Sequence, residues 1–506
     1  MKSAFAIVGC GATAVAFLQR HLDRVAAGSA PAGVIYLFEK RQDFGPGAAY
    51  EADLQSNILN TKTAFITPFP DQPGHFQRWL EEHPSAWRSA FPTFQPAAES
   101  FAPRALFGVY LQHQIRKIVL RGASLGCQIV LMHAEVSAID PIDGTETVRT
   151  RCGLSIATQK VLLFCGPLGK KIDPARHDAR VLSTPYPVSR LLSVIDPDER
   201  VAVIGARLSA IDTVIALIEG GHRGPIRMHS RSGYFPVVRG TQERVELKHL
   251  TREGVRALVA QNGPLQISDL VALFRKELAA HDPASTTAVI PMPAPPPDVI
   301  RFIEDELNVS RAPRIWQAIL YATNGFIEHV WQALDASAQA RFMSEYFSFF
   351  MAYRVSIPSE NARKILSYLR NGQLEFVAGA FASPQADSQG LTLQGAGWAH
   401  VYDRLIHATG FPRDAQLLDS ALLAALIKNG TATAHAMGGI CVDPDSYRLQ
   451  GRAAGTRQIY AVGELTVGQF FFTSALEING RHAFRCADSM QWQGQSQRLE
   501  RMEEHV

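Results

Sequence analysis

The chain has 506 residues, of which 46% are apolar and 19% charged, and its formal net charge is +3. This composition predicts a globular protein of about two or three domains. No block of like charges indicates nucleic acid or an anionic membrane as a partner.

Cysteine usage and apolar runs exclude several further classes of protein. The six cysteines contain no C-x-x-C pair, which argues against a disulfide framework, a dithiol centre and a zinc site, so no metal is expected. No stretch reaches the roughly 18 uninterrupted apolar residues that span a bilayer. The glycine-interrupted apolar start lacks the cleavage site of a secretory signal, and a cytoplasmic protein is expected.

The N-terminal segment is typical of the start of a dinucleotide-binding domain. Residues 4–8 form an apolar run, and a G-x-G-x-x-A turn follows that opens an amphipathic helix. Gly9 permits the tight turn, Gly11 lets the backbone approach a pyrophosphate, and Ala14 allows close packing of helix and strand. Because the helix N-terminus offers free N–H groups to phosphate, the predicted site comprises Gly9, Gly11, Ala12, Thr13 and Ala14.

A second apolar strand at residues 34–38 ends in Glu39 and Lys40. A carboxylate at this strand end is placed to accept hydrogen bonds from a ribose. The separation between Gly9 and Glu39 exceeds the usual spacing of about twenty residues, so the intervening helix or loop is expected to be extended. Glycine-rich turns between a strand and a helix also occur without a ligand, and that alternative stays open.

A second turn of the same kind follows an apolar strand at residues 200–204. It begins with Gly205 and continues to Ser209, but Arg207 stands where the first turn has Gly11. The Arg207 side chain would crowd a pyrophosphate bound in the usual way. Two interpretations are therefore open: Arg207 turns outward and pairs with a phosphate, or the half-domain persists as a scaffold whose nucleotide site is weakened or lost.

The strand after the second turn, predicted at residues 226–229, is followed by basic residues. Arg231, with Arg227 or Arg239, fits a role in binding a 2′-phosphate, because a guanidinium forks onto phosphate oxygens.

A helical insertion then replaces the alternating strand–helix pattern. Helices are predicted at residues 244–281, 298–307, 312–334 and 338–354, with a proline-rich connector at 290–297. Aromatic residues recur at helical spacing on the last of these helices, and they fit either core packing or a substrate pocket. They are Phe342, Tyr346, Phe349, Phe350 and Tyr353.

Two apolar strands near the C-terminus end in turns suited to a flavin site. Residues 404–409 run through Thr409 into Gly410, and residues 459–462 run into Gly463 and Glu464. A strand followed by glycine and an acid brings a carboxylate and backbone amides toward a ribityl chain and pyrophosphate. Both strands are expected to complete the first domain, which is then discontinuous.

With these segments in place, the chain resembles the FAD/NAD(P)-binding family of bacterial oxidoreductases, relatives of the two-dinucleotide flavin monooxygenases and N-hydroxylase-like. The resemblance covers most of the chain. It rests on the N-terminal turn and on G-P-G-A-A-Y at 45–50, N-I-L-N-T at 57–61, F-x-P-R at 101–104 and G-x-x-T-x-G-x-x-F at 463–471. Cys165-Gly166-Pro167 departs from the A-T-G turn of relatives, which is expected to alter the crossover to the second domain.

The resemblance assigns further cofactor residues, which are Asn57, Asn60 and Thr61 near the flavin, Arg104 near the adenine side, and Phe471 in the closing motif. Alternatively, the asparagines are turn residues and Arg104 is a surface cation. Trp316 and Arg354 match residues that recur in the family's insertion. Arg354 would suit a substrate carboxylate, and a salt bridge on a helix surface is an equally good account of it.

The implied fold is α/β, with two Rossmann-like dinucleotide-binding domains and a helical insertion. The predicted ranges are 1–195 and 396–506 for a discontinuous FAD domain, 196–240 and 355–395 for an NAD(P)-like domain, and 241–354 for an insertion that caps the substrate site.

The implied activity is that of an FAD-dependent monooxygenase. NADPH would reduce FAD, and the reduced flavin would react with dioxygen to a C4a-(hydro)peroxide that oxygenates a small molecule, with amine N-hydroxylation preferred. No catalytic residue is predicted, because the cofactor performs the bond making. The alternatives are a flavin oxidase or dehydrogenase that needs no NADPH, and a non-catalytic flavin-binding protein.

Overall fold

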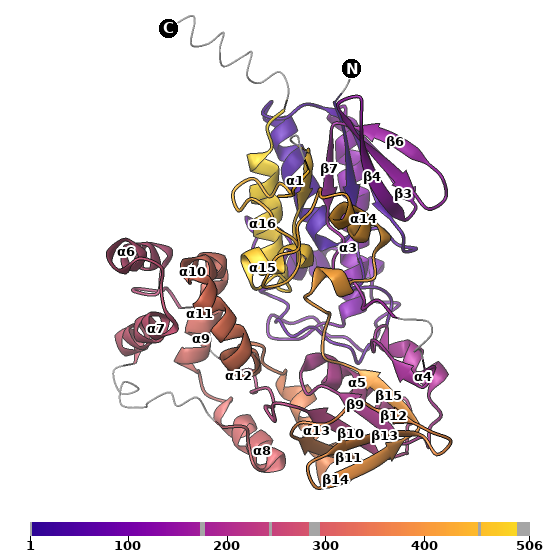
Figure 1. The fold of residues 1–506 in the computed structure, drawn as a ribbon, viewed down its shortest axis with the longest axis vertical. Helices are drawn as coiled ribbons and strands as arrows, with labels where there is room; N and C mark the ends of the chain where they lie inside the picture. The colour runs from indigo at the N-terminus through magenta and orange to yellow at the C-terminus, as the bar shows by residue number, and fades with distance from the viewer. Residues whose placement is uncertain (1–2, 173–177, 242–244, 283–293, 454–456, 493–506) are drawn as a thin grey trace, which may run out of the picture. The chain divides into compact units, whose positions relative to one another are not determined.

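The structure is a computed structural model that describes residues 3–172, 178–241, 245–282, 294–453 and 457–492. The chain divides into two compact units (Figure 1). Unit 1 comprises Met1–Glu51, Thr61–Leu168 and Pro412–Val506, and unit 2 comprises Ala52–Asn60 and Gly169–Phe411. The predicted helix start at Arg244 and residues 290–293 of the proline-rich connector lie outside the described residues.

Unit 1 is built on a five-stranded parallel sheet with the strand order β16-β7-β1-β2-β3. The apolar N-terminal run becomes its central strand, because a strand covered on both faces requires apolar residues throughout. Its members are β1 (Ser3–Val8), β2 (Gly33–Glu39), β3 (Gln128–His133), β7 (Lys160–Leu163) and β16 (Ile459–Ala461).

Helix α1 (Ala12–Ala26) follows the first turn and packs against both α3 (Arg104–Ser124) and the C-terminal α16 (Leu476–Ser489). A three-stranded antiparallel sheet of β4 (Val136–Ile142), β5 (Thr145–Thr150) and β6 (Ser155–Thr158) completes the unit, and α14 (Ala421–Lys428) packs on β4. Its shorter elements are α2 (His75–Glu82), η1 (Pro84–Ala86), η7 (Ala415–Leu417), η8 (Glu464–Thr466) and α15 (Val467–Phe470).

Unit 2 repeats this architecture with different strands. Its parallel sheet has the order β11-β10-β9-β15-β8, so β9, β10 and β15 occupy the places of β1, β2 and β7. The strands are β8 (Val181–Leu182), β9 (Val201–Ile204), β10 (Ile226–Ser230), β11 (Leu374–Ala378) and β15 (Arg404–His407). A small antiparallel sheet again accompanies it, formed by β12 (Gln385–Ala386), β13 (Leu391–Gly395) and β14 (Trp398–Tyr402).

The apolar helix α5 (Leu208–Glu219) follows the second turn, and it packs against α13 (Ser359–Arg370) and α4 (Leu191–Val194) in the core of unit 2. The short η3 (Val188–Arg190) precedes α4. Among the described residues, no helix combines the length and apolar character needed to cross a membrane.

The insertion is helical, as predicted, but its helices are shorter than the sequence pattern suggested. Residues 312–334 break at the turn η5 (Thr323–Gly325), where Asn324 and Gly325 interrupt the helix because both are poor helix formers. Residues 338–354 contain the π-helical turn η6 (Phe342–Tyr346). The helices are α6 (Arg252–Asn262), α7 (Ile267–His281), α8 (Val299–Val309), α9 (Ile315–Ala322), α10 (Ile327–Ala333), α11 (Ala336–Arg341) and α12 (Phe347–Arg354).

One expected strand lies in the other sheet. Residues 404–409 were expected in the FAD domain, whereas β15 pairs in parallel with β9 of unit 2, with Leu405 opposite Ala202. The chain returns to unit 1 only at Pro412, and residues 169–195 belong to unit 2. The apolar run itself carries no information about its pairing partner, since every parallel strand buried on both faces has the same pattern.

His21 makes the stability of unit 1 depend on pH. It is 1% exposed on α1, and neither ring nitrogen has a hydrogen-bond partner among the described residues. Burial, with a smaller effect of Arg24, lowers its pKa from 6.5 to about 4. The unfolded chain therefore binds this proton first, so the free energy of unfolding should fall as the pH drops from 6.5 toward 4.

Between pH 6.5 and 4 the free energy of unfolding should fall by roughly 3 kcal/mol less in His21→Leu than in the unmodified chain. Leucine does not titrate and leaves no unpaired ring nitrogen. Denaturant unfolding at a series of pH values measures the effect. Parallel pH profiles for His21→Leu and the unmodified chain would contradict the assignment.

Candidate functional site

The first glycine-rich turn allows no side chain at Gly9. Its φ of +99° lies in the left-handed region, and its N–H donates to the carbonyl of Phe38 at 2.8 Å. A Cβ at this position would lie 2.3 Å from the carbonyl oxygen of Phe164. Glycine is therefore required for both conformation and space.

The structure itself does not require glycine at position 11. As N-cap of α1 it has φ −102° and ψ −168°, a backbone that any residue adopts, and a Cβ would meet only the Cα of Gly47, at 3.7 Å. No side chain caps α1 within the described residues, and its first turn has no acid. The amide groups and positive dipole end thus remain available for a phosphate.

The loop at residues 45–50 lies against this turn and against α3. The N–H of Gly45 donates to the carbonyl of Cys10 at 2.9 Å, and a Cβ on Gly108 would lie 2.0 Å from the carbonyl of Tyr50. Burial raises the pKa of Tyr50 to about 12, an effect that Arg104 opposes. The structure therefore brings three of the sequence motifs together around the first turn.

Glu39 stands at the carboxyl end of β2 and is only 4% exposed. Its Oε2 accepts the N–H of Cys10 and its Oε1 the N–H of Arg41, both at 2.9 Å. Each oxygen retains acceptor capacity for a ribose hydroxyl. The neighbouring Lys40 is exposed and forms an ion pair with Glu135 at 3.6 Å.

The second turn has the same backbone as the first. Gly205 has φ +124° and donates to the carbonyl of His229 at 2.8 Å, and a Cβ there would lie 2.5 Å from the carbonyl oxygen of Ala408. Arg207, as N-cap of α5, has φ −99° and ψ −169°, almost the values of Gly11. Ser209 follows in the first turn of α5, which contains no acid.

The two turns differ at the end of the neighbouring strand. Since β9 pairs with β10 in the register in which β1 pairs with β2, Ser230 occupies the place of Glu39, and Arg231 follows it. Arg231 is exposed, with its guanidinium carbon 5.9 Å from the centroid of the Phe381 ring. Unit 1 therefore presents a carboxylate at this position and unit 2 a hydroxyl, and a basic residue, Lys40 or Arg231, follows in each unit.

Thr409 and Gly410 lie beside the second turn, not the first as expected. The Thr409 nitrogen is 3.4 Å from the position of a Cβ on Gly205. The residues in the corresponding place of unit 1 are Cys165 and Gly166, because Cys165 follows β7 and approaches Gly9 in the same way. The Cys165-Gly166-Pro167 segment thus takes the structural place of the turn that relatives form with A-T-G.

The asparagines of the N-I-L-N-T motif belong to unit 2. Asn57 is 3% exposed and donates to Asp53 at 2.9 Å, and the carbonyl of Asn60 accepts a hydrogen bond from Arg239 at 2.6 Å. These contacts agree with the interpretation that both are turn residues. A flavin contact by Asn57, Asn60 or the following Thr61 stays a prediction, as does an adenine contact by Arg104.

The C-terminal motif begins at Gly463, with φ +93°, directly after β16. Burial raises the pKa of Glu464, while Arg413 and a hydrogen bond from Thr473 at 3.3 Å oppose the shift. Phe471 has φ +66° and ψ −60°, and the N–H of Phe472 donates to the carbonyl of Phe470 at 2.8 Å. Phe471 is therefore the centre of a strained γ-turn, a conformation concentrated at functional sites.

The insertion brings Arg354 and Trp316 onto adjacent helices. Arg354 is 4% exposed, donates to Asn324, and lies 5.3 Å from the centroid of the Tyr321 ring. The Trp316 ring is 5.8 Å from that of Tyr353 on α12. Tyr321 and Asn324 were not predicted as site residues, although Asn324-Gly325 is a sequence signal for a helix break.

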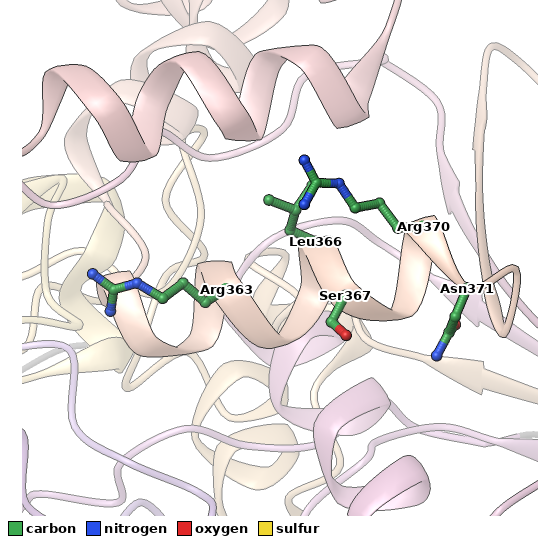
Figure 2. A pocket seen from close by; sticks show the side chains of 5 residues that line it. All are labelled: Arg363, Leu366, Ser367, Arg370 and Asn371. Carbon is green, nitrogen blue, oxygen red and sulfur yellow. The ribbon is translucent and has the colours of Figure 1, made fainter.

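A hollow of about 420 Å³ lies on α13 (Figure 2). Its side chains project from this helix and the residue after it, and they are Arg363, Leu366, Ser367, Arg370 and Asn371. Arg363 donates to Ser359, and Arg370 pairs with Glu304 at 2.5 Å. Both cations are engaged by surface neighbours, so the hollow does not form a convergent polar site.

Within the parts of the chain that the structure describes, no group of three His, Cys, Asp or Glu side chains could hold a metal ion. The features available for a ligand are thus the two glycine-rich turns, their strand ends, and the cluster on the insertion.

A known protein family matches the part of the chain that contains the first turn. The model of the FAD-NAD(P)-binding family matches residues 6–168. These residues form an FAD-NAD(P)-binding domain. No curated protein matches the chain by sequence.

Solved structures resemble the whole chain. An ornithine hydroxylase from Pseudomonas aeruginosa is 16% identical, with a TM-score of 0.56 over 97% of this chain and 98% of the other. An ornithine N-hydroxylase from Kutzneria sp. 744 is 18% identical, with a TM-score of 0.55 over 97% and 99%. A cadaverine monooxygenase from Erwinia amylovora is 11% identical, with a TM-score of 0.55 over 97% and 94%. At these identities the likeness confirms the predicted α/β fold with two dinucleotide-binding domains.

The geometry at Gly11 predicts a graded loss of flavin. Gly11→Ala should fold and retain less FAD, because its Cβ meets only an ordinary contact at 3.7 Å. Gly11→Val should be purified without flavin, since a branched side chain fills the space that the pyrophosphate needs. The ratio of visible flavin absorbance to protein absorbance measures both effects.

Gly169→Val is the control, because a Cβ at Gly169 has no neighbour within 4 Å. Full flavin content in a folded Gly11→Val protein would contradict the placement of FAD at the first turn.

Proposed function

We propose that the protein is an FAD-dependent monooxygenase that uses NADPH and dioxygen to hydroxylate the amino group of a small molecule. The observation that carries the proposal is the pair of equivalent turns, of which the first has the carboxylate of Glu39 at the strand end and the second has Ser230 there, followed by Arg231. A carboxylate at Glu39 suits the ribose of FAD and repels a 2′-phosphate, whereas a guanidinium at Arg231 attracts that phosphate.

FAD fits the first turn. Gly9 and Gly11 leave room for the pyrophosphate at the start of α1, Glu39 accepts from the adenosine ribose, and Glu464 after β16 is the acid expected near the ribityl chain. Bound flavin supplies hydride acceptance and dioxygen activation. The protein binds the cofactor and fixes its orientation.

NADPH fits the second turn in the same way. The start of α5 receives the pyrophosphate, with Gly205 forming the turn and Ser209 in the first turn of the helix. Arg231 binds the 2′-phosphate in a bidentate contact. Ser230 in the place of Glu39 removes the carboxylate that would repel this phosphate.

The cluster on the insertion suits a substrate that carries a carboxylate. Arg354 donates a hydrogen bond to Oδ1 of Asn324, and the rings of Tyr321 and Trp316 supply faces for an alkyl chain or an ammonium group. Two of the resembling proteins are ornithine hydroxylases and one is a cadaverine monooxygenase. Of these two types of substrate, an amino acid with a terminal amine fits Arg354 better than a plain diamine.

A flavin oxidase without NADPH is the second candidate, and Arg207 favours it. Its side chain occupies the position that a glycine leaves open in the first turn, so it could keep a nucleotide out. In that case the organic substrate itself would reduce the flavin.

The experiment is to supply the purified protein with NADPH, air and either L-ornithine or cadaverine. We expect L-ornithine to accelerate NADPH consumption more than cadaverine does, and mass spectrometry to detect a product heavier by one oxygen atom. Flavin bleaching by an amine in the absence of NADPH would instead establish the oxidase. If neither NADPH nor the amine reduces the flavin, the protein is a flavin-binding protein without this enzymatic activity.

Arg231→Ala should raise the KM for NADPH about tenfold and leave that for NADH nearly unchanged, because only NADPH has the 2′-phosphate. Initial-rate kinetics with both nucleotides measure the difference. Arg223→Ala is the control, since Arg223 pairs with Asp198 on the surface of the same unit. Equal effects on both nucleotides would show that Arg231 does not bind this phosphate.

A further inference from the structure

Arg207 occupies the second turn without distorting it. Its φ of −99° and ψ of −169° match those of Gly11, which are −102° and −168°. This is extended backbone that any residue adopts, so the exchange of glycine for arginine changes the side chain at the turn and leaves the path of the chain unchanged. The question is what the guanidinium does there.

The guanidinium lies against an aromatic ring of the insertion. Its central carbon is 5.7 Å from the centroid of Phe347, the first residue of α12, which follows the π-helical turn η6. Burial lowers the pKa of Arg207, and no carboxylate among the described residues opposes that shift. The contact with Phe347 is a cation–π interaction, which positions the charge without neutralising it.

This environment has a physical consequence. A partly buried cation loses hydration, and an aromatic face compensates for that loss only in part. An anion bound at the start of α5 would compensate for the lost hydration of the guanidinium, because the helix dipole and the guanidinium both attract negative charge. The first turn has only the helix to offer, since Gly11 has no side chain.

We propose that Arg207 binds the pyrophosphate of the dinucleotide at the second turn and that Phe347 positions its guanidinium for this contact. The inference rests on the proposed function, which places NADPH at this turn. In this role Arg207 does not obstruct the site. Its side chain contacts the phosphates directly, a contact that the first turn, with Gly11, cannot make. Phe347 is a positioning residue, because it acts on the nucleotide only through Arg207.

The test is the substitution Arg207→Gly, which restores the glycine of the first turn. If the arginine binds the pyrophosphate, the Kd for NADP+ should rise roughly tenfold, the effect of losing a charge-assisted hydrogen bond. If the arginine obstructs the site, the same substitution should lower the Kd. Isothermal titration of the FAD-containing protein with NADP+ therefore separates the two interpretations by the sign of the change.

Three further measurements distinguish this role from a structural one. Arg207→Gly should weaken the binding of NADP+ and of NAD+ by the same factor, because both nucleotides have the pyrophosphate. The same substitution should make the Kd for NADP+ less dependent on salt concentration. Arg207→Lys should retain part of the affinity, since it keeps the charge and loses the fork. Phe347→Leu should raise the Kd for NADP+ less than Arg207→Gly does. Each variant should retain FAD, which shows that unit 1 is intact.

The outcomes separate this inference from the proposed function. Failure of the unmodified protein to bind NADP+ would overturn both. Binding of NADP+ by the unmodified protein, together with unchanged or tighter binding by Arg207→Gly, would overturn the role of Arg207 and leave the proposed function in place. If Arg207→Gly does not fold, full affinity in Arg207→Lys combined with salt-independent binding would overturn the inference.

Discussion

Both halves of the molecule depend on a close approach between a glycine and a strand end. In unit 1 the position of a Cβ on Gly9 is 2.3 Å from the carbonyl oxygen of Phe164, and in unit 2 that of a Cβ on Gly205 is 2.5 Å from the carbonyl oxygen of Ala408. No side chain fits at such distances. Each contact holds the start of a helix directly above the ends of the central strands, where its amide groups can meet a phosphate.

Equivalent backbones with different side chains underlie the proposed difference in nucleotide preference between the two turns. The first turn combines Gly11 with the carboxylate of Glu39, and the second combines Arg207 with Ser230 and Arg231. In the proposed function, one half selects a dinucleotide with a free ribose and the other a dinucleotide with a 2′-phosphate, on a common scaffold. The charges at these few positions, rather than the fold, carry the proposed division of labour.

Local patterns predicted the parts of the fold that depend on local physics. Apolar runs before Gly9 and Gly205 located the central strands, and the spacing of glycines located the helix starts. The helical nature of the insertion also followed from its sequence. The place of residues 404–407 did not, because a buried parallel strand shows no preference for one sheet over another until its partner is known. Its pairing with β9 moved Thr409 and Gly410 from the first turn to the second.

The candidate site was predictable to a similar extent. The residues of the two turns followed from their motifs, whereas the contact of Arg207 with Phe347 joins residues 140 positions apart (347 − 207) and had no sequence signal. The pair of Arg354 and Asn324 is also non-local, at a separation of 30 positions, and a helix break separates α9 from the helices that follow. The hydrogen bond from Asn57 to Asp53 depends on the path of a loop, which a motif does not specify.

The central claim is that one turn holds a flavin and the other a reducing nucleotide. The most direct measurement is the visible spectrum of the purified protein during an anaerobic titration with NADPH. We predict a flavin spectrum that is bleached by one equivalent of NADPH per flavin, and more slowly by NADH. A flavin spectrum that persists in excess NADPH would contradict the role of the second turn, and a colourless protein that cannot be reconstituted with FAD would contradict the whole account.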